Sequence, residues 1–402
     1  MTQPLGQPDR TPGRDEAFLV GDDEFRTATG EPIERTLDLN TWQVGVDLGA
    51  LYARLEAEVG PALTQERRIQ NLVRAEIFPH LRTPDAPAEA GVHRAKPTDL
   101  EEVHRKVLFS GQLDACDGTS ITHDTLLLTV TQIGICLISY QGDELAISQR
   151  MYRRDLRSVG ADPVEEAKEL LARRKDRAAA GAVDKRDTLS ELARRGIMTY
   201  AERATLLHRS TAQWRMGHGN VAPYELLTGS GNMALLAESL KVLRDLIDYE
   251  QFVFVPSSIK DRLLLTIGDA LEPQEYAIVQ TGEQAMRRIV DGGRYHPDSR
   301  RLADSFVDDM GSKVAVGVYR ASAHSPATPF FAHVDRVHEA AHIAMADSLL
   351  QEHRGFPLSI DLADMACRAM FGAEAFDDAV SSAYREHGEP LRYLPERNTR
   401  EQ

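Results

Sequence analysis

Apolar positions along the chain follow two spacings, one helical and one typical of strands. Residues 40–82 place apolar side chains three or four positions apart, which predicts a pair of helices broken at Gly60-Pro61. From about residue 107 onward, short runs rich in apolar and β-branched residues indicate strands of a sheet. The predicted strands cover residues 107–116, 126–140, 224–228, 251–256, 276–280, 314–319 and 329–333.

Helical patterns separate these strands. They cover the strongly charged residues 161–215, then 233–247, and finally 335–385 with a break at Gly355-Phe356-Pro357. Strands that alternate with helices predict an α/β fold, with antiparallel hairpins in the first part of the sheet.

The same pattern divides the chain into segments. Residues 1–36 are rich in Pro, Gly, Thr and charge, which predicts a flexible tail. Residues 37–98 are expected to form a helical segment and a proline-containing connector. Residues 99–390 are expected to form the α/β domain, with a charged helical insertion at about 151–215, and residues 391–402 a C-terminal tail.

One aspartate stands at the end of the first apolar run. Asp117 follows Leu113–Cys116 and precedes Gly118. Because Asp-Gly is a turn dipeptide, the pattern predicts that a central strand ends at Asp117. A carboxylate there suits a metal ligand, since the strand holds it rigidly while the turn leaves it open to substrate. The alternative is a turn aspartate that bonds its own backbone.

Composition narrows the function classes. A hydrophobic fraction of 42% and a charged fraction of 27% are ordinary for a soluble globular protein. We find no apolar stretch long enough to span a bilayer and no apolar signal core in Met1–Arg10, so neither a membrane protein nor a secreted one is expected. Cys116, Cys136 and Cys367 lie in apolar surroundings, which argues against a disulfide framework and fits a reducing cytoplasm.

Net charge bears on nucleic-acid binding. The chain carries 47 basic and 62 acidic residues, a net charge of −15. A chain this acidic is not a general nucleic-acid coat, because phosphate binding needs local positive potential. The balance still allows a nucleic-acid enzyme with a basic channel and clustered carboxylates for metal ions.

Two short motifs offer alternative chemistries. Gly229–Ala234 fits G-x-G-x-x-A between a predicted strand and a helix, as in dinucleotide-binding proteins. The next strand ends without the acidic residue that would hold the ribose, so a tight strand-to-helix turn is favoured. His338-Glu339-Ala340-Ala341-His342 is a literal H-E-x-x-H, which on a helix could hold zinc in a peptidase, with Asp347 or Glu352 as third ligand. The nearby Arg336 favours a polar helix surface instead.

Carboxylates from distant segments offer a third chemistry. Besides Asp117, Glu202 lies on a predicted helix, where Glu191 competes with it for the same role. Asp361 and Asp364 lie near one face of an otherwise apolar helix. An acid on an apolar helix needs a partner or a cation, because burying a charge alone is costly. Carboxylates that converge at a strand end could hold Mg²⁺ or Mn²⁺ for phosphodiester hydrolysis.

Four short motifs occur in a fixed order over roughly residues 105–385. They are the strand-turns Leu113–Ser120 and Leu226–Ser230, the strand Phe252–Val255 after a long helix, and Arg354–Asp364 at the C-terminal helix. In this order they resemble the NurA nuclease family, which has an RNase H-like fold.

The resemblance implies an RNase H-like mixed sheet flanked by helices and a metal-dependent nuclease. Asp117 would be the first ligand of Mn²⁺ or Mg²⁺, Glu202 the acid from a helix, and Asp364 the C-terminal site residue. Such a protein would be a cytoplasmic homodimer that works on DNA ends or single strands with a HerA-type hexameric ATPase, in repair or defence.

One position departs from the family pattern. Thr228 stands where the second strand motif usually carries an aspartate, and threonine brings no full negative charge to a cation. Glu225 is three residues back, and on a strand it would point to the opposite face. An alternative is therefore a catalytically weakened adaptor for the ATPase.

Overall fold

The computed structural model describes residues 21–42, 48–84, 86–124, 129–142, 146–154, 163–172, 192–293 and 295–391. Internal contacts divide the chain into two units, residues 1–67 and 68–402. Unit 1 contains α1 (Asp22–Thr29), α2 (Ile33–Leu37), a 3₁₀ turn at Leu39–Thr41 and most of α3 (Leu48–Glu76). Among the described helices, none is both long enough and apolar enough to cross a membrane.

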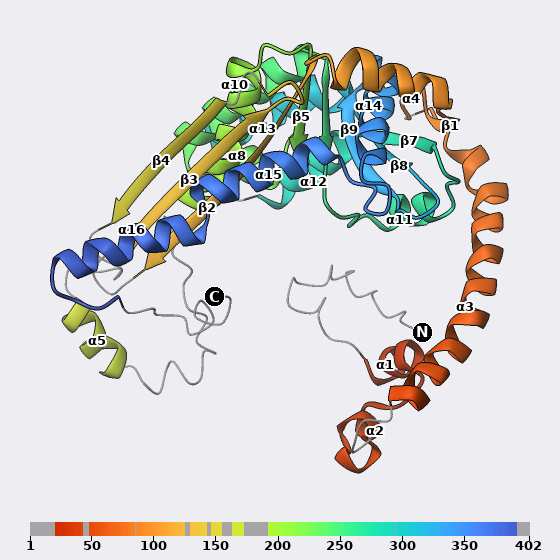
Figure 1. Ribbon diagram of the computed structural model, residues 1–402, viewed down its shortest axis with the longest axis horizontal. Helices are drawn as coiled ribbons and strands as arrows, with labels where there is room; N and C mark the ends of the chain where they lie inside the picture. Colours follow the sequence, from red (N-terminus) through yellow and green to blue (C-terminus); the bar gives the residue numbers. More distant parts are fainter. Residues whose placement is uncertain are drawn as a thin grey trace, which may run out of the picture. The chain divides into compact units, whose positions relative to one another are not determined.

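A mixed sheet organises unit 2. Its described strands are β1 (Gly91–Arg94), β2 (Leu113–Asp124), β3 (Thr129–Ile138), β4 (Ala146–Arg154), β5 (Trp214–His218), β6 (Phe252–Val255), β7 (Glu275–Thr281), β8 (Val314–Arg320) and β9 (Thr328–His333). Their order across the sheet is β1-β7-β8-β9-β6-β5-β2-β3-β4 (Figure 1).

The half of the sheet around β2 has the RNase H-like arrangement. β2, β3 and β4 form antiparallel neighbours, whereas β5 runs parallel to β2 and β6 runs parallel to β5. β9, β8, β7 and β1 continue the sheet beyond β6 with antiparallel pairs. The α/β class and the mixed sheet flanked by helices are therefore confirmed.

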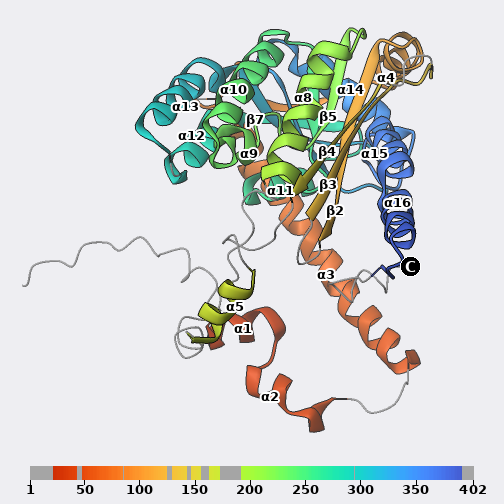
Figure 2. The ribbon, with the colours of Figure 1, turned by 90° about the vertical axis from the view of Figure 1, so that its left-hand side faces the viewer.

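Helices cover both faces of this sheet (Figures 1 and 2). The described helices of unit 2 that follow β1 are α4 (Pro97–Val103), α5 (Pro163–Ala172), α8 (Met198–Arg209), α9 (Tyr224–Leu227), α10 (Met233–Asp248), α11 (Arg262–Asp269), α12 (Glu283–Gly292), α13 (Pro297–Met310), α14 (Val337–Leu349), α15 (Leu358–Phe371) and α16 (Ala373–Glu386). Figure 2 shows β2, β3 and β4 between α15 and α16 on one side and α8 and α10 on the other.

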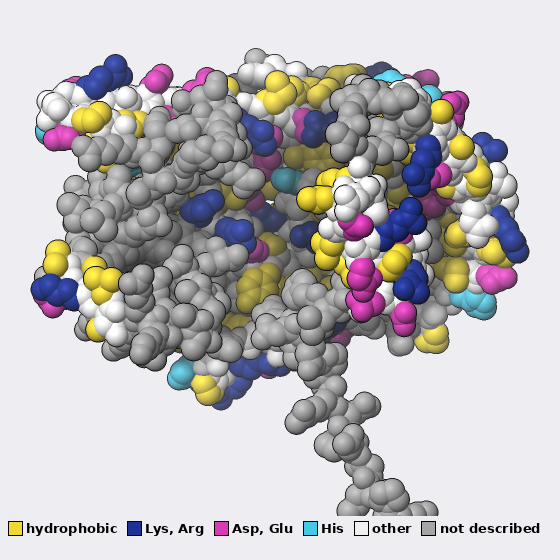
Figure 3. Space-filling model, turned by 90° about the horizontal axis from the view of Figure 1, so that it is seen from below, with side chains coloured by type: hydrophobic (Ala, Val, Ile, Leu, Met, Phe, Trp, Pro, Cys, Tyr) yellow, Lys and Arg dark blue, Asp and Glu magenta, His cyan; other side chains and the backbone are white. Residues whose placement is uncertain are grey.

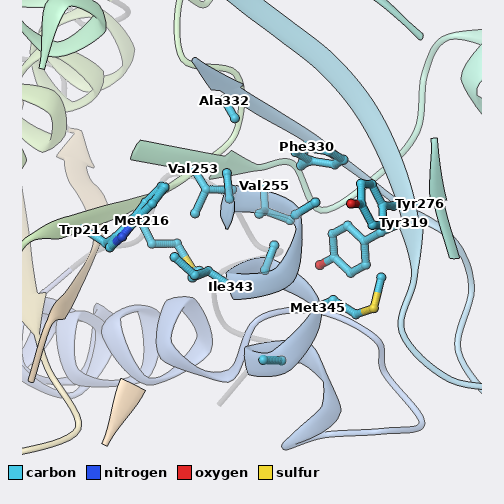
Figure 4. Close-up of a cluster of buried hydrophobic side chains, with 14 of the residues drawn as sticks. Trp214, Met216, Val253, Val255, Tyr276, Tyr319, Phe330, Ala332, Ile343 and Met345 are labelled. Atoms are coloured by element: carbon cyan, nitrogen blue, oxygen red, sulfur yellow. The ribbon is translucent and has the colours of Figure 1, made fainter. Parts of the chain in front are cut away.

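The core is split between the two faces because strand side chains alternate. Val253 and Val255 of β6 pack with Met345 of α14 in one buried cluster (Figure 4). Phe252 and Phe254 of the same strand belong to a second cluster, on the face of α8, α10 and α13. A strand buried on both faces reads as a continuous apolar run, which is why β6 could be predicted from the sequence.

The N-terminal helices differ from the prediction. α3 runs without interruption from Leu48 to Glu76 and contains Pro61, so the predicted pair of helices is wrong. Proline removes one backbone hydrogen bond, but Ala, Leu, Glu, Gln and Arg dominate both sides, and their helix propensity favours continuation. Helices α1 and α2 lie within residues 22–37, and most of this range was expected to be part of the tail.

The first strand begins later than predicted, and another precedes it. Val107 and Leu108 belong to a π-helical turn, His104–Leu108, and β2 starts only at Leu113. A short apolar run has no periodicity that separates a strand from a buried turn, and Leu108 is indeed fully buried. β1, β4 and β5 were not predicted as strands.

Two further predictions, for Asp117 and for residues 224–228, are wrong. β2 does not end at Asp117 but continues to Asp124, with Asp117 opposite Cys136 of β3. The segment 224–228 is not a strand, since Tyr224–Leu227 forms the short helix α9. Without a strand before Gly229, the dinucleotide-binding motif also loses its structural context.

Candidate functional site

The pairing between β2 and β5 ends just before Asp117. β2 and β5 pair from Leu113↔Trp214 to Cys116↔Gly217, after which β5 ends at His218 while β2 continues along β3. Asp117 is thus the first residue of β2 beyond its parallel partner. A residue at this point is held by the β3 ladder on one side and is open on the other.

Asp117 lies on the α15 face of the sheet. Directly opposed residues of an antiparallel pair point to the same face, and the partner of Asp117 is Cys136. Cys136 packs against Cys367 and Phe371 of α15. Asp117 also accepts a hydrogen bond from the backbone N–H of Gly118 at 2.9 Å.

Glu202 reaches the same point from α8, on the other face. A Cβ at Gly118 would lie 2.7 Å from Glu202 Oε1 and 3.1 Å from Met198 Cγ. The glycine therefore marks a close approach of a carboxylate to the strand, and not the predicted turn. Glu202 itself is buried.

A pocket of about 440 Å³ joins these residues, and we call it the carboxylate pocket. It brings together the three predicted site residues Asp117, Glu202 and Asp364, although they come from β2, α8 and α15. Its lining is completed by Gly118, Thr119, Ser120, Arg195, Met198, Thr199, Arg203, His218, Gly219, Asn220, Pro223, Glu225 and Arg368.

Two other predicted acids have different outcomes. Glu191 lies outside the described residues. Asp361 is buried elsewhere, where it accepts a hydrogen bond from Gln351 Nε2 at 2.6 Å and pairs with Arg354. The i, i+3 spacing on the helix placed Asp361 and Asp364 near one face. It did not show that only Asp364 lines the pocket.

Glu225 lines the pocket, and Thr228 does not. The expectation that Glu225 points away assumed a strand, and α9 removes that assumption. Thr228 is occupied locally: its hydroxyl donates to Tyr224 O at 2.7 Å and accepts from the backbone N–H of Ser230 at 3.3 Å. A fourth carboxylate is therefore present three residues before the position where one seemed to be missing.

His218 and Arg203 are further pocket residues that sequence reasoning missed. His218 went unnoticed because β5 was not recognised, and Arg203 because its partners lie at the end of β5 and just after it. The available signal was the alternation of Trp214 and Met216 with smaller or polar residues, followed by Gly219-Asn220, which is a turn signature.

The electrostatics of the pocket follow from burial and pairing. Burial raises the pKa of Glu202 to about 7, against the opposing effect of the neighbouring Arg203, and the Asp117 charge adds to the rise. His218 Nδ1 lies 3.4 Å from Asp117 Oδ1, and this contact raises the pKa of the imidazole in spite of its partial burial. Asp117 thus stabilises the charged form of His218.

Asp364 is the most exposed of the three predicted acids. Arg368 Nε lies 2.9 Å from Asp364 Oδ1, one turn along α15, and the Arg368 side chain is 71% exposed. Exposed ion pairs of this kind contribute little to stability, so Asp364 can exchange this partner for another cation at small cost. On the face seen in Figure 3, basic and acidic side chains are likewise interspersed.

The donor set fits a hard divalent cation. Carboxylate oxygens are the ligands that Mg²⁺ and Mn²⁺ prefer, and four carboxylates line this pocket. Their oxygens do not form a group in which all lie within 4.8 Å of one another. Like charges favour separation, so a cation would have to draw these side chains together.

Among the described residues, one group does meet that distance: Glu250, His333 and Asp335. Its atoms already have partners. His333 Nδ1 accepts the backbone N–H of Asp335 at 3.3 Å, and Arg336 Nε lies 3.9 Å from Glu250 Oε2. This group offers two carboxylates where the carboxylate pocket offers four, so we regard the pocket as the better candidate metal centre.

The H-E-x-x-H motif lies on α14, as predicted for a helix, but its first histidine is occupied. His338 Nδ1 is 2.8 Å from the Tyr276 hydroxyl, and Nε2 is 3.1 Å from Glu89 Oε2. His342 stands edge-on to the Tyr276 ring, and burial lowers its pKa. With both ring nitrogens of His338 engaged, the arrangement does not favour a zinc peptidase.

Comparisons with known proteins give similarities of fold. No protein-family model matches the chain, and no curated protein matches its sequence. The NurA nuclease from Sulfolobus solfataricus aligns with 9% identity and a TM-score of 0.43, covering 85% of this chain and 99% of that one. NurA bound to dAMP and manganese aligns with 8% identity and a TM-score of 0.39, covering 82% and 97%.

A second kind of nuclease is also similar. Endonuclease V from Bacillus subtilis aligns with 10% identity and a TM-score of 0.29, covering 69% of this chain and 92% of that one. At these identities and TM-scores the similarities carry no argument about activity.

Proposed function

We propose that the chain is a metal-dependent nuclease that hydrolyses DNA phosphodiester bonds. The observation that carries the proposal is the convergence of Asp117, Glu202, Glu225 and Asp364 on one pocket. Acids from four separate elements repel one another, and a divalent cation would offset that repulsion beyond what His218, Arg203 and Arg368 already do.

The pocket residues would divide the work. Asp117, Glu202, Glu225 and Asp364 would hold Mn²⁺ or Mg²⁺, with Glu202 and Asp364 also able to orient the attacking water. A bound cation of this kind neutralises charge on the phosphate oxygens and makes water more acidic.

Two arginines of the pocket suit the substrate. Arg195 and Arg368 line it with exposed side chains, and guanidinium groups match phosphate oxygens in charge and geometry. They supply local positive charge on a chain whose net charge is −15.

The wider setting belongs to the same proposal. By the family resemblance, the protein would be a cytoplasmic homodimer that acts on DNA ends or single strands with a HerA-type hexameric ATPase, in repair or defence. Light scattering on the purified protein tests the dimer, and joint purification with such an ATPase tests the partner.

The weakened-adaptor alternative has lost its main support. It depended on Thr228 standing in place of an acid, and Glu225 now supplies a carboxylate to the pocket. Titration of Mn²⁺ into the purified protein by calorimetry separates the two, because an adaptor that had lost its metal site would show no saturable binding.

The decisive experiment replaces Asp117. Asp117→Asn keeps the size of the side chain and removes its charge, so we expect Mn²⁺-dependent degradation of linear DNA to fall at least 100-fold, on the order of 3 kcal/mol in the barrier. Asp114→Asn is the matched control, on the same strand but outside the pocket, and it should cleave as the wild type does. Cleavage that survives Asp117→Asn would discard the assignment.

A further inference from the structure

Arg203 is an arginine buried at the wall of the carboxylate pocket. Its side chain is only 2% exposed, and it directly follows Glu202 on α8. A buried guanidinium is costly unless charge and hydrogen bonds compensate it. Its partners therefore indicate what it is there to hold.

These partners lie on two different segments. Nη1 pairs with the Glu202 carboxylate, and Nη2 donates to the backbone oxygens of His218 at 3.2 Å and Asn220 at 2.6 Å. The face of the guanidinium lies over the Phe254 ring, 5.0 Å from its centroid. Arg203 thus joins α8 to the loop that follows β5.

That loop carries pocket residues at both ends. It begins at His218, beside Asp117, and leads through Pro223 into α9, where Glu225 lies. Gly219 has a left-handed φ of +86°, and its N–H bonds Val255 O at 3.1 Å. The loop is therefore fixed at its first turn by β6 and by the two carbonyl groups that Arg203 holds.

We propose that Arg203 is a positioning residue, which sets Glu202 and the loop from His218 to Glu225 in one arrangement so that the pocket can take up a divalent cation. The proposal depends on the proposed function only for the cation. The geometric part, that one guanidinium orders the loop, stands on the contacts themselves.

Arginine is suited to this task in a way that lysine is not. The planar group makes one pair with a carboxylate and two bonds to carbonyl oxygens while its Cζ lies over the Phe254 ring. An ammonium group is a point charge on a flexible stem and cannot keep all of these contacts together. Arg203→Lys therefore retains the charge and loses the positioning.

A matched control is available on β5. Arg215 is also buried, bonds the α8 backbone through Leu206 O at 2.6 Å, and lies 3.5 Å over the Tyr249 ring, but it does not line the pocket. Arg203→Lys and Arg215→Lys each remove the planar group of a buried arginine that bonds α8. Only the first touches the loop and Glu202.

The test has two readouts on the full chain. Hydrogen exchange without metal measures the order of residues 218–225, and calorimetric titration with Mn²⁺ measures cation affinity. We expect Arg203→Lys to speed exchange in this loop at least 10-fold and to weaken Mn²⁺ binding by on the order of 10–100-fold, as residues that orient ligands do. Arg215→Lys should leave both as in the wild type.

Other outcomes decide against the proposal. Unchanged loop exchange in Arg203→Lys, or equal effects in both variants, would mean that Arg203 stabilises the fold in general, and so would an Arg203→Lys chain that is unfolded by circular dichroism. Should the wild type bind no Mn²⁺ while the loop of Arg203→Lys still exchanges faster, the metal-dependent function fails and the positioning of the loop is upheld.

Discussion

Gly118 leaves the space that the Glu202 carboxylate occupies above β2. In Gly118→Ala, the added methyl group would meet Glu202 Oε1 at 2.7 Å and Ile135 Cδ1 at 2.8 Å. We expect a loss of about 1–3 kcal/mol in the free energy of unfolding, as for other overpacked sites, together with weaker Mn²⁺ binding.

Urea unfolding and calorimetry measure the two effects of Gly118→Ala. Gly292→Ala is the control, because a Cβ there would have no heavy atom within 4 Å. If Gly118→Ala bound Mn²⁺ as tightly as the wild type, the close approach of Glu202 to β2 would not matter for the pocket.

Glu225 and Thr228 are the two residues that could complete the ligand set of the pocket, and substitution of each one tests which does so. Glu225 lines the pocket, whereas the Thr228 hydroxyl bonds Tyr224 O and the Ser230 N–H. We expect Glu225→Gln to weaken Mn²⁺ binding at least 10-fold, about 1.4 kcal/mol, and Thr228→Val to leave it unchanged. Calorimetric titration of both variants measures this, and the reverse result would mean that Thr228, and not Glu225, takes part in cation binding.

Helix α15 is held at its first turn by a buried acid from α14. Asp347 is fully buried, and its carboxylate accepts the backbone N–H of Ser359 at 3.2 Å, the Ser359 hydroxyl and the Tyr140 hydroxyl. Burial raises the pKa of Asp347, and these three donors act against the rise. A carboxylate at a helix N-terminus also meets the favourable end of the helix dipole.

Removal of this acid should loosen the helix that carries Asp364. Asp347→Ala removes the carboxylate that accepts all three donor groups, and we expect a loss on the order of 3 kcal/mol in the free energy of unfolding. Asp335→Ala, an exposed acid on a neighbouring turn, should change stability by less than about 0.5 kcal/mol. Denaturant unfolding of both variants would refute the anchor if they behaved alike.

The elements that could not be predicted share one physical cause. Asp-Gly is normally a turn signal, but in β2 the glycine is required by Glu202, a contact 84 positions away in sequence (202 minus 118). Tyr224–Leu227 could be a strand or a helix by its own propensity, and its packing against α10 and α12 side chains decides for a helix. Tertiary contacts overrode local preference at both positions.

Partly buried histidines make the folding stability of unit 2 depend on pH. Burial lowers the pKa values of His93, His333 and His342. A lowered pKa in the folded state means that protonation favours the unfolded chain. Stability from these groups is therefore complete above the unfolded value, about 6.5, and is lost as the pH falls below it.

His342→Gln isolates one of these contributions. The ring faces Tyr276, with Asp99 and Glu339 acting to raise its pKa and His338 to lower it. We expect the wild type to lose more stability than His342→Gln between pH 7 and pH 5, measured by urea unfolding. The exposed His387→Gln should track the wild type, and parallel curves for all three proteins would contradict the prediction.

The sequence allowed the class of fold and three of the pocket acids to be predicted, and it did not reveal the pocket itself. Strands such as Phe252–Val255 can be recognised from sequence, because they are buried on both faces and every residue is apolar. Asp117, Glu202 and Asp364 were found as acids in apolar contexts. Glu225 was set aside because a strand was expected where α9 forms, and His218 and Arg203 were missed because β5 and the residues after it have no strong local pattern.

The opening of the sheet beyond Cys116↔Gly217 has a consequence for how the protein can be divided. The four acids of the carboxylate pocket come from the sheet and from helices on both faces of the sheet. No contiguous fragment shorter than Asp117 to Asp364 therefore contains them all. A cation bound there would tie three layers together. Ligand at 100 times its dissociation constant would then favour the intact fold by about 2.7 kcal/mol, and a truncation that removes Asp117 or Asp364 would weaken that linkage.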